Sequence, residues 1–280
     1  MTKTATRTDK LKEAHDRLVQ AVESIVTGDD WKRMLQVSAK FHKYSFNNQL
    51  LIYLQRPDAT YVAGFRRWLE LKRFVLKGEK GIAILAPCRY KTKIEDEHGD
   101  EQTLTSIRGF RVVHVFDVSQ TDGEPLDDLD AVRPKLLVGA APDGLWDALV
   151  TQCGETGYDV VREQEGSENG RCDMLNKVIA VRPDVSDAQA VKTLIHELAH
   201  AMLHDGQAVA SREIAEVEVE SVAYIVSDAL GLDTSRYSFN YIARWSNGDV
   251  DVIRSTMERA IRCAGHILTT LQLPTNQRAG

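Results

Sequence analysis

The segment from Thr193 to His200 contains an HExxH motif inside an apolar run that favours a helix. On an α-helix, residues four apart lie on one face, one turn apart. His196 and His200 therefore present two imidazoles to the same point, an arrangement suited to holding one zinc ion. Glu197 is the next residue round, within reach of a water on such a metal, where it would act as general base. The alternative is an amphipathic helix with two surface histidines, because the bare motif also occurs by chance.

The residues around the motif support a helix. Asp184 and Ser186 are candidates for the N-cap. Apolar residues follow at helical spacing, namely Ala188, Val191, Leu194, Ile195, Leu198 and Met202. This stripe predicts that one face of the helix is buried.

A catalytic zinc site uses three protein ligands and keeps one position open, so the two histidines need a third partner. Cysteine is poorly placed to provide it, because the four cysteines are scattered singly and form no CxxC pair. A second predicted helix over residues 213–226 follows a short polar turn and is rich in glutamate. This helix is the better source of the third ligand.

Helical spacing separates the glutamates of this second helix. Glu213, Glu216 and Glu220 share one face, whereas Glu218 lies about 200° round from Glu216. An acidic stripe is usually a solvated face, and this is our interpretation of Glu218. Glu216 is the preferred third ligand, because the histidine pair needs one and this helix follows directly.

His204 also lies on the motif helix, about 12 Å along the axis from His196 at 1.5 Å per residue. One ion is not easily reached from both ends of that span, so we do not expect His204 to be a ligand. Two interpretations remain, a cation that interacts with the dipole at the helix C-terminus, and a group that supports the ligands from behind.

The motif His196–His200 followed by Glu216–Ala223 resembles the zincin-type metallopeptidase domain of ArdC-type antirestriction proteins, and more distantly the ImmA/IrrE peptidases. In those families an E-x-x-A-(D/N/E) helix supplies the third ligand from its first glutamate. The resemblance thus implies Glu216 as ligand and Glu220 as a carboxylate that orients a ligand histidine. Val219 departs from the pattern, where alanine is usual.

The N-terminal half resembles the single-stranded-DNA-binding domain of the same family. The matching blocks are residues 44–52, 63–68, 75–87 and 115–121. The resemblance implies an α+β fold: a helix-rich domain with a small sheet over 1–130, then a zincin-like metallopeptidase domain over 131–280. We expect the residues from 121 to 134 to be the linker, since they are rich in Asp, Pro and Gly.

Charge is distributed unevenly along the chain. The first 93 residues carry 19 basic and 9 acidic side chains, a net +10, and the rest carry 16 and 32, a net −16, which together give the −6 of the whole. A basic segment suits a polyanion, because phosphate neutralisation drives such binding.

The same segment holds aromatic residues, on which bases of a single strand can stack. We expect about two thirds of these rings to be buried. The candidates for DNA contact are Lys43, Asn48, Arg66, Arg67, Trp68, Lys77 and Lys80.

Hydropathy predicts helices near 8–27, 29–42, 47–55, 64–72, 142–153, 235–245 and 248–271, strands near 82–86, 110–116 and 157–162, and a hairpin near 170–182. The strand over 177–181 precedes the motif helix and is a candidate for pairing with an extended peptide. Tyr224 and Tyr241 are candidates for stabilising an oxyanion. No apolar run is long enough to span a membrane, and the unpaired cysteines fit a cytoplasmic location.

The resemblance implies that the protein binds single-stranded DNA, carries Zn²⁺ and protects incoming plasmid or phage DNA from restriction. Two alternatives remain open. One is a regulatory zinc peptidase that cleaves a repressor or another host protein. The other is a DNA-binding shield in which the zinc site is structural and no peptide is cut.

Overall fold

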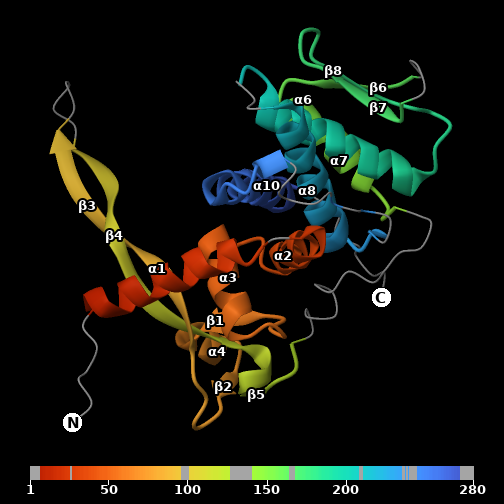
Figure 1. The fold of residues 1–280 in the computed structure, drawn as a ribbon. Helices are drawn as coiled ribbons and strands as arrows, with labels where there is room; N and C mark the ends of the chain where they lie inside the picture. Colours follow the sequence, from red (N-terminus) through yellow and green to blue (C-terminus); the bar gives the residue numbers. More distant parts are fainter. Residues whose placement is uncertain are drawn as a thin grey trace. The chain divides into compact units, whose positions relative to one another are not determined.

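The computed structural model describes residues 7–25, 27–95, 101–126, 141–163, 168–207, 211–234 and 245–271, with residues 237 and 239. Helices and the strands of small sheets follow one another in runs along the chain, which confirms the α+β class (Figure 1). The chain forms two compact units. The first combines Met1–Ala21 with Asn47–Pro125, and the second combines Val22–Phe46 with Leu126–Gly280.

The first unit contains helices packed on a three-stranded antiparallel sheet, and a short two-stranded ribbon. Its elements are α1 (Arg7–Glu23), α3 (Phe46–Gln55), β1 (Val62–Gly64), α4 (Phe65–Glu70), β2 (Arg73–Val75), β3 (Ile82–Glu95), β4 (Glu101–Asp117), η1 (Val118–Gln120) and β5 (Thr121–Gly123). The sheet has the order β1-β4-β3, and β2 pairs with β5. The expected linker therefore begins with a strand, and residues 127–134 of it lie outside the described residues.

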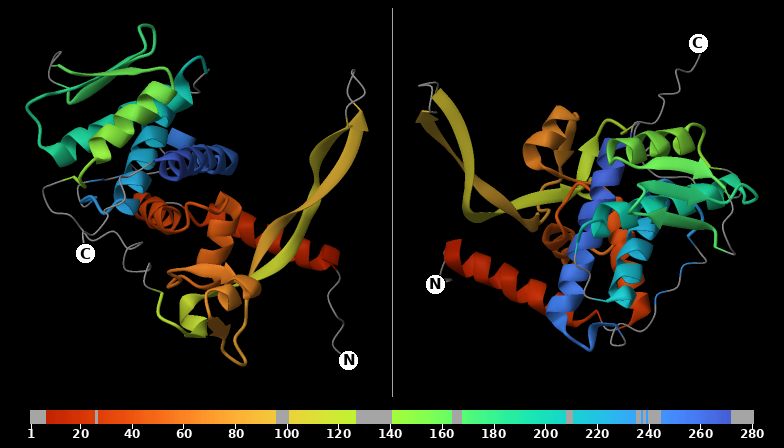
Figure 2. Two further views of the ribbon diagram at one scale, coloured as in Figure 1. Left: turned by 180° about the vertical axis from the view of Figure 1, so that it is seen from behind. Right: turned by 90° about the horizontal axis from the view of Figure 1, so that it is seen from above.

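Strands β3 and β4 are much longer than the sequence pattern indicates, and they form an extended hairpin (Figures 1 and 2). The expected first strand, near 82–86, stops just before Pro87, a residue that cannot donate to a ladder. In the structure the register shifts between Pro87 and Arg89, and the pairing continues to Glu95. The extra residue of this shift is on β4, and Pro87 lies two residues after Leu85, so its nitrogen faces the free edge of β3, where no ladder bond is lost and the strand need not end.

The free edge of β3 is covered by two side-chain amides from α3. Asn48 donates to the Leu85 carbonyl at 2.9 Å and accepts from the Leu85 N–H at 2.8 Å. Gln55 does the same for Ala83, with both bonds 2.9 Å long. The two amides are seven residues apart, two helical turns, and so lie on one face of α3. They complete the hydrogen bonding of an edge strand that would otherwise be open.

The second unit contains helices and a three-stranded mixed sheet. Its elements are α2 (Gly28–Lys40), α6 (Leu145–Glu155), β6 (Asp159–Arg162), β7 (Gly170–Asp173), β8 (Val178–Val181), α7 (Asp187–His204), α8 (Arg212–Ala229) and α10 (Val250–Thr270). The sheet order is β6-β8-β7, with β6 parallel and β7 antiparallel to β8. The expectation that β8 pairs with a peptide is wrong, because both of its edges are already occupied.

Helix α2 packs in the second unit, although it belongs to the basic N-terminal segment. Trp31 is 1% exposed and its indole N–H donates to the Ser221 hydroxyl of α8 at 2.9 Å. Its ring also meets Trp245 edge-on, with centroids 5.2 Å apart. Residues 22–46 thus group with the C-terminal part, whereas the sequence division at residue 130 places them in the first domain.

The expected helix over 235–245 falls almost entirely outside the described residues. All four cysteines are free. Among the described helices, none combines the length and apolar character that crossing a bilayer requires.

The amide cover on β3 gives a first prediction. Gln55→Ala should lower the free energy of unfolding by about 1–3 kcal/mol, because the N–H and carbonyl of Ala83 lose their partners. Urea unfolding measures the change. Asn47→Ala is the control on the same helix, since its amide makes no hydrogen bond with another of the described residues. Equal losses in both variants would show that helix content, and not the edge cover, is responsible.

Candidate metal site

Helices α7 and α8 build the candidate site, and each begins at a serine N-cap. Ser186 accepts from the Gln189 N–H and Ser211 accepts from the Ile214 N–H. Of the two expected N-cap candidates for α7, the structure selects Ser186, while Asp184 pairs with Arg182. The apolar face of α7 is buried as expected, with Leu194, Ile195 and Leu198 fully inaccessible. These contacts fix the rotation of the helix, and therefore the direction of its histidines.

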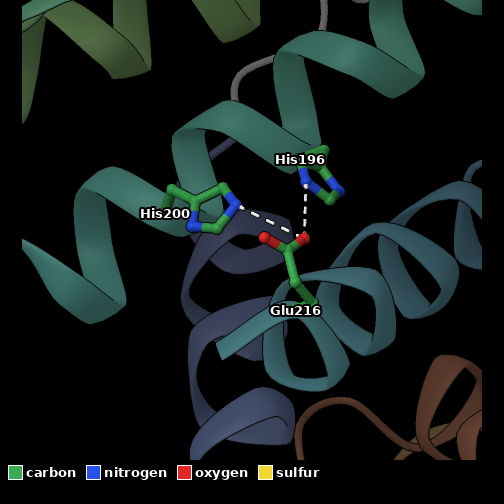
Figure 3. A group of neighbouring side chains, drawn as sticks. All are labelled: His196, His200 and Glu216. Carbon is green, nitrogen blue, oxygen red and sulfur yellow. Dashed lines mark ion pairs between the residues drawn. The ribbon is translucent and has the colours of Figure 1, made fainter. Parts of the chain in front are cut away.

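His196, His200 and Glu216 meet at one point between the two helices (Figure 3). One ligand atom from each lies within 4.8 Å of the others. The Glu216 Oε2 atom is 3.8 Å from His196 Nε2 and 3.9 Å from His200 Nε2. Two imidazole nitrogens and one carboxylate oxygen are the donor set of many catalytic zinc sites, so these residues fit a divalent metal.

The environment of the histidines favours metal binding. Burial lowers the pKa of His196 to about 4. Burial, with the neighbouring His196 and His204, lowers the pKa of His200 to about 4. Both rings are therefore neutral near neutral pH, and a neutral imidazole is the form that binds a metal. Glu216 is more exposed than either histidine, at 46% of its side chain, so the site opens to solvent on its side.

Glu220 lies one turn beyond Glu216, and its Oε1 atom is 3.7 Å from His196 Nδ1. Burial and the charge of Glu216 raise the pKa of Glu220. The carboxylate therefore faces the ring nitrogen of His196 that points away from Glu216. Glu213, on the same face of α8, is exposed and takes no part in the cluster.

Glu197 is buried beside the cluster, with 7% of its surface exposed. It accepts a hydrogen bond from the backbone N–H of Cys172 in β7. Burial, and then the charges of Glu216 and Glu168, raise its pKa to about 7.

Strand β7 approaches the motif helix closely at Gly170, where a Cβ atom would stand 2.4 Å from Thr193 Cγ2 and 3.1 Å from Glu197 Oε1. Glycine at this position is what lets the strand lie against the motif helix.

Glu218 is not on a solvated face, so that interpretation is wrong. Its side chain is 3% exposed, accepts from Arg259 Nε at 2.6 Å and lies 2.9 Å from His204 Nε2. Helix α8 is covered by α7 on one side and by α10 and α2 on others, so a turn of 200° leads to another helix and not to water. The partner that explains this burial, Arg259, is on α10 and carries no motif in the sequence.

His204 ends α7 and is 6% exposed. Its Nδ1 atom is 3.2 Å from His200 Nδ1. It therefore supports His200 from behind, in line with one of the two interpretations made from the sequence. Tyr224, a candidate for oxyanion stabilisation, is fully buried and packs edge-on against Tyr237 at 5.5 Å, and Tyr241 lies outside the described residues.

The candidates for DNA contact separate into three groups. Arg66, Arg67, Lys77 and Lys80 are exposed in the first unit. Lys43 is exposed as well but belongs to the second unit. The structure does not bring Trp68 to the surface, since the ring is fully buried and donates to the Phe116 carbonyl at 3.0 Å, and Asn48 already pairs with β3.

Two aromatic rings that the sequence could not single out are exposed near these basic residues. Phe65 is 52% exposed on α4 and Phe74 is 62% exposed on β2, and α4 packs against β2. Of the nine rings between Trp31 and Phe74, four are buried, fewer than the expected two thirds. We call Phe65, Phe74, Arg66, Arg67, Lys77 and Lys80 the basic aromatic face.

A small mixed sheet followed by an HExxH helix and a glutamate-bearing helix defines a metallopeptidase-like domain. Comparisons with known protein families find the same kind of domain in this part of the chain and a second domain before it. Residues 8–116 match the family described as the N-terminal domain of anti-restriction factor ArdC, and residues 153–237 match the M78 peptidase family, described as the IrrE N-terminal-like domain. The chain therefore joins a domain of the ArdC N-terminal family to a metallopeptidase-like domain of the M78 family, the combination expected of an ArdC-type protein.

Individual relatives are distant. An uncharacterised protein of Bacillus anthracis is 24% identical over 282 residues, which is 87% of this chain, and the chain spans about half, 48%, of that relative. The metal-free crystal structure of the antirestriction protein ArdC from plasmid R388 is 22% identical, with a TM-score of 0.48 and coverage of 81% of this chain and 82% of that one. Its Mn(II)-bound structure is 21% identical, with a TM-score of 0.46 and coverage of 85% and 97%.

The raised pKa of Glu197 gives a second prediction, for protein freed of metal. Between its ordinary pKa of 4.5 and about 7, the folded chain keeps a proton on Glu197 that the unfolded chain has released. This contribution to stability is present below the lower value and is lost as pH rises through the upper one. Glu197→Gln removes the effect, so its stability relative to wild type should rise across this window. Urea unfolding at several pH values measures the difference, and a difference that stays constant across the window would contradict the prediction.

Proposed function

We propose that this protein binds single-stranded DNA through its first unit and Zn²⁺ through its second, and that it protects incoming plasmid or phage DNA from restriction. The observation that carries the proposal is the meeting of His196, His200 and Glu216 beside a buried Glu197, in a chain whose N-terminal part matches the ArdC N-terminal domain. The free cysteines support a reducing, cytoplasmic location.

His196, His200 and Glu216 would hold the ion, with Glu220 placed to orient His196. A zinc ion in a site with three protein ligands acts as a Lewis acid toward a carbonyl and activates water. Glu197 does not need to bind the metal, because three donors are already present. Its buried carboxyl, with a pKa near neutrality, suits the work of a general base that takes a proton and passes it to a leaving amine.

The basic aromatic face is the proposed site for single-stranded DNA. Exposed guanidinium and ammonium groups would neutralise phosphates, and the rings of Phe65 and Phe74 would stack on bases without regard to sequence. No hydrogen-bonding partner for base edges is needed in this mode of binding. The face suits incoming DNA of any origin, which a protective role requires.

Two other functions use the same parts. A regulatory peptidase would bring the metal site to a repressor or host protein bound near the DNA. A shield would use the metal only to stabilise the second unit, and would protect DNA without cutting a peptide. Glu197→Gln in the full-length protein separates them in a restriction assay with incoming DNA. A shield keeps full protection in this variant, whereas a function that needs peptide cleavage loses it.

A third prediction concerns metal content. Purified wild-type protein should carry about one zinc per chain, and Glu216→Ala should lose most of it, because a third ligand is removed. Elemental analysis after dialysis measures the content. Glu213→Ala, one turn away on the same face, should retain the metal, and so should Glu197→Gln. Loss of zinc from Glu197→Gln with retention in Glu216→Ala would reverse the two assignments.

A fourth prediction concerns DNA. Phe65→Ala and Phe74→Ala should each weaken binding of single-stranded DNA by about 1–3 kcal/mol without changing its dependence on salt. Replacing Arg66, Arg67, Lys77 and Lys80 together with glutamine should flatten the salt dependence, by about 0.7 in log–log slope for each phosphate that the variant no longer neutralises. Filter-binding titrations at several salt concentrations measure both effects.

The matched control is Leu175→Ala, which removes an exposed apolar side chain from the second unit. It should leave both affinity and slope unchanged. An affinity that does not respond to salt, or that depends on bound metal, would contradict the assignment of DNA binding to this face.

A further inference from the structure

A chain of hydrogen-bonding groups runs from the metal site into the core of the second unit. His200 Nδ1 lies 3.2 Å from His204 Nδ1, and His204 Nε2 lies 2.9 Å from Glu218 Oε2. The other oxygen of Glu218 accepts from Arg259 Nε at 2.6 Å, and Arg259 also donates to the Leu203 carbonyl at 3.0 Å. These four side chains come from three helices, α7, α8 and α10.

Glu218 and Arg259, at the end of this network away from the metal site, fix the direction of each of its hydrogen bonds. A carboxylate can only accept and a guanidinium can only donate. Glu218 therefore requires a proton on His204 Nε2, which leaves His204 Nδ1 as an acceptor when the ring is neutral. That acceptor in turn requires a proton on His200 Nδ1. The remaining nitrogen, His200 Nε2, then carries the lone pair, and this is the atom that faces Glu216.

We propose that Glu218 is a positioning residue that acts through His204 to hold His200 in the tautomer whose Nε2 lone pair points into the metal site. The inference rests on the proposed function in one respect, that His200 binds a metal. The side chains of His204 and Glu218 are only 4% and 3% exposed, so water does not readily replace either partner. A buried network of this kind favours one arrangement of protons over the other.

A simpler role for Glu218 is to hold α8 against α10 through Arg259. That role requires the ion pair but places no demand on the tautomer of His200. The two roles respond differently to Glu218→Gln and to Arg259→Met. The first change keeps the shape of the side chain and alters the bonds it can make, and the second removes the ion pair and leaves the carboxylate in place.

The test is the tautomer of His200 in metal-free protein at about pH 8, where an ordinary histidine is neutral. Two-bond ¹H–¹⁵N correlation spectra of histidine-labelled protein distinguish a protonated ring nitrogen from a bare one. Wild-type protein should show His200 with a proton on Nδ1 and His204 with a proton on Nε2. A wild-type His200 protonated on Nε2 would overturn the proposal, and this spectrum decides even if a variant does not fold.

Glu218→Gln should reverse both tautomers. Arg259 can only donate, so it holds the amide oxygen, and the amide NH₂ then donates to His204 Nε2. His204 must now donate from Nδ1 to His200 Nδ1, which places the proton of His200 on Nε2. Zinc affinity, measured by competition with a chelator, should fall about 10–100-fold, the usual effect of losing a group that orients a ligand.

Arg259→Met is the control, because the carboxylate remains and still accepts from His204. It should lower stability but leave the His200 tautomer and zinc affinity close to wild type. The double variant Glu218→Gln with Arg259→Met should restore the original tautomers, since the amide is free to turn its oxygen to His204. If Arg259→Met changes the tautomer as much as Glu218→Gln does, the holding role explains the data and the proposal fails. If wild-type protein binds no zinc, the proposed metal site is wrong. The spectra still show which nitrogen of His200 carries the proton, and so they test the role of Glu218 separately.

Discussion

The rotation of α7 against α8 is the constraint on which the candidate site depends. The buried apolar face of α7 and the packing of α8 against three other helices leave each helix one orientation about its axis. In that orientation His196, His200 and Glu216 converge, and Glu218 reaches His204 at the end of α7 and Arg259 of α10. A turn of one residue, about 100°, in either helix would separate the three donors. The metal site is therefore a product of core packing as much as of the motif.

The same packing explains which parts of the site were predictable from the sequence. The spacing of His196, His200 and Glu216 predicts a shared face, because it needs only the period of a helix. Helical spacing also predicts that Glu218 points away from the site. It does not predict what Glu218 meets there, because Arg259 is 41 residues further along and α10 reaches it only through the tertiary fold. The expectation of a solvated Glu218 failed for this reason.

The fold divides in the same way between local and distant information. The α+β class and most helices follow from periodicity and from the family resemblance. The order of β6, β7 and β8 does not, since the parallel pairing of β6 with β8 joins segments separated by β7. The place of α2 is also set at long range, by the burial of Trp31 between Ser221 and Trp245. Strand β3 continues past Pro87 because the nitrogen of this residue faces the free edge of the sheet, where no ladder bond is lost.

The amide groups of Asn48 and Gln55 have a consequence for association between chains. Open edges of sheets recruit strands from other molecules, which leads to strand exchange and aggregation. Leu85 and Ala83 are two residues apart and so turn their backbone groups to the same outer side of β3. Each of these residues already has its donor and its acceptor occupied by an amide that is part of the same unit. An incoming strand would have to displace two bidentate partners before gaining its first pair of bonds, so this stretch of the sheet resists polymerisation without carrying a charge on its edge.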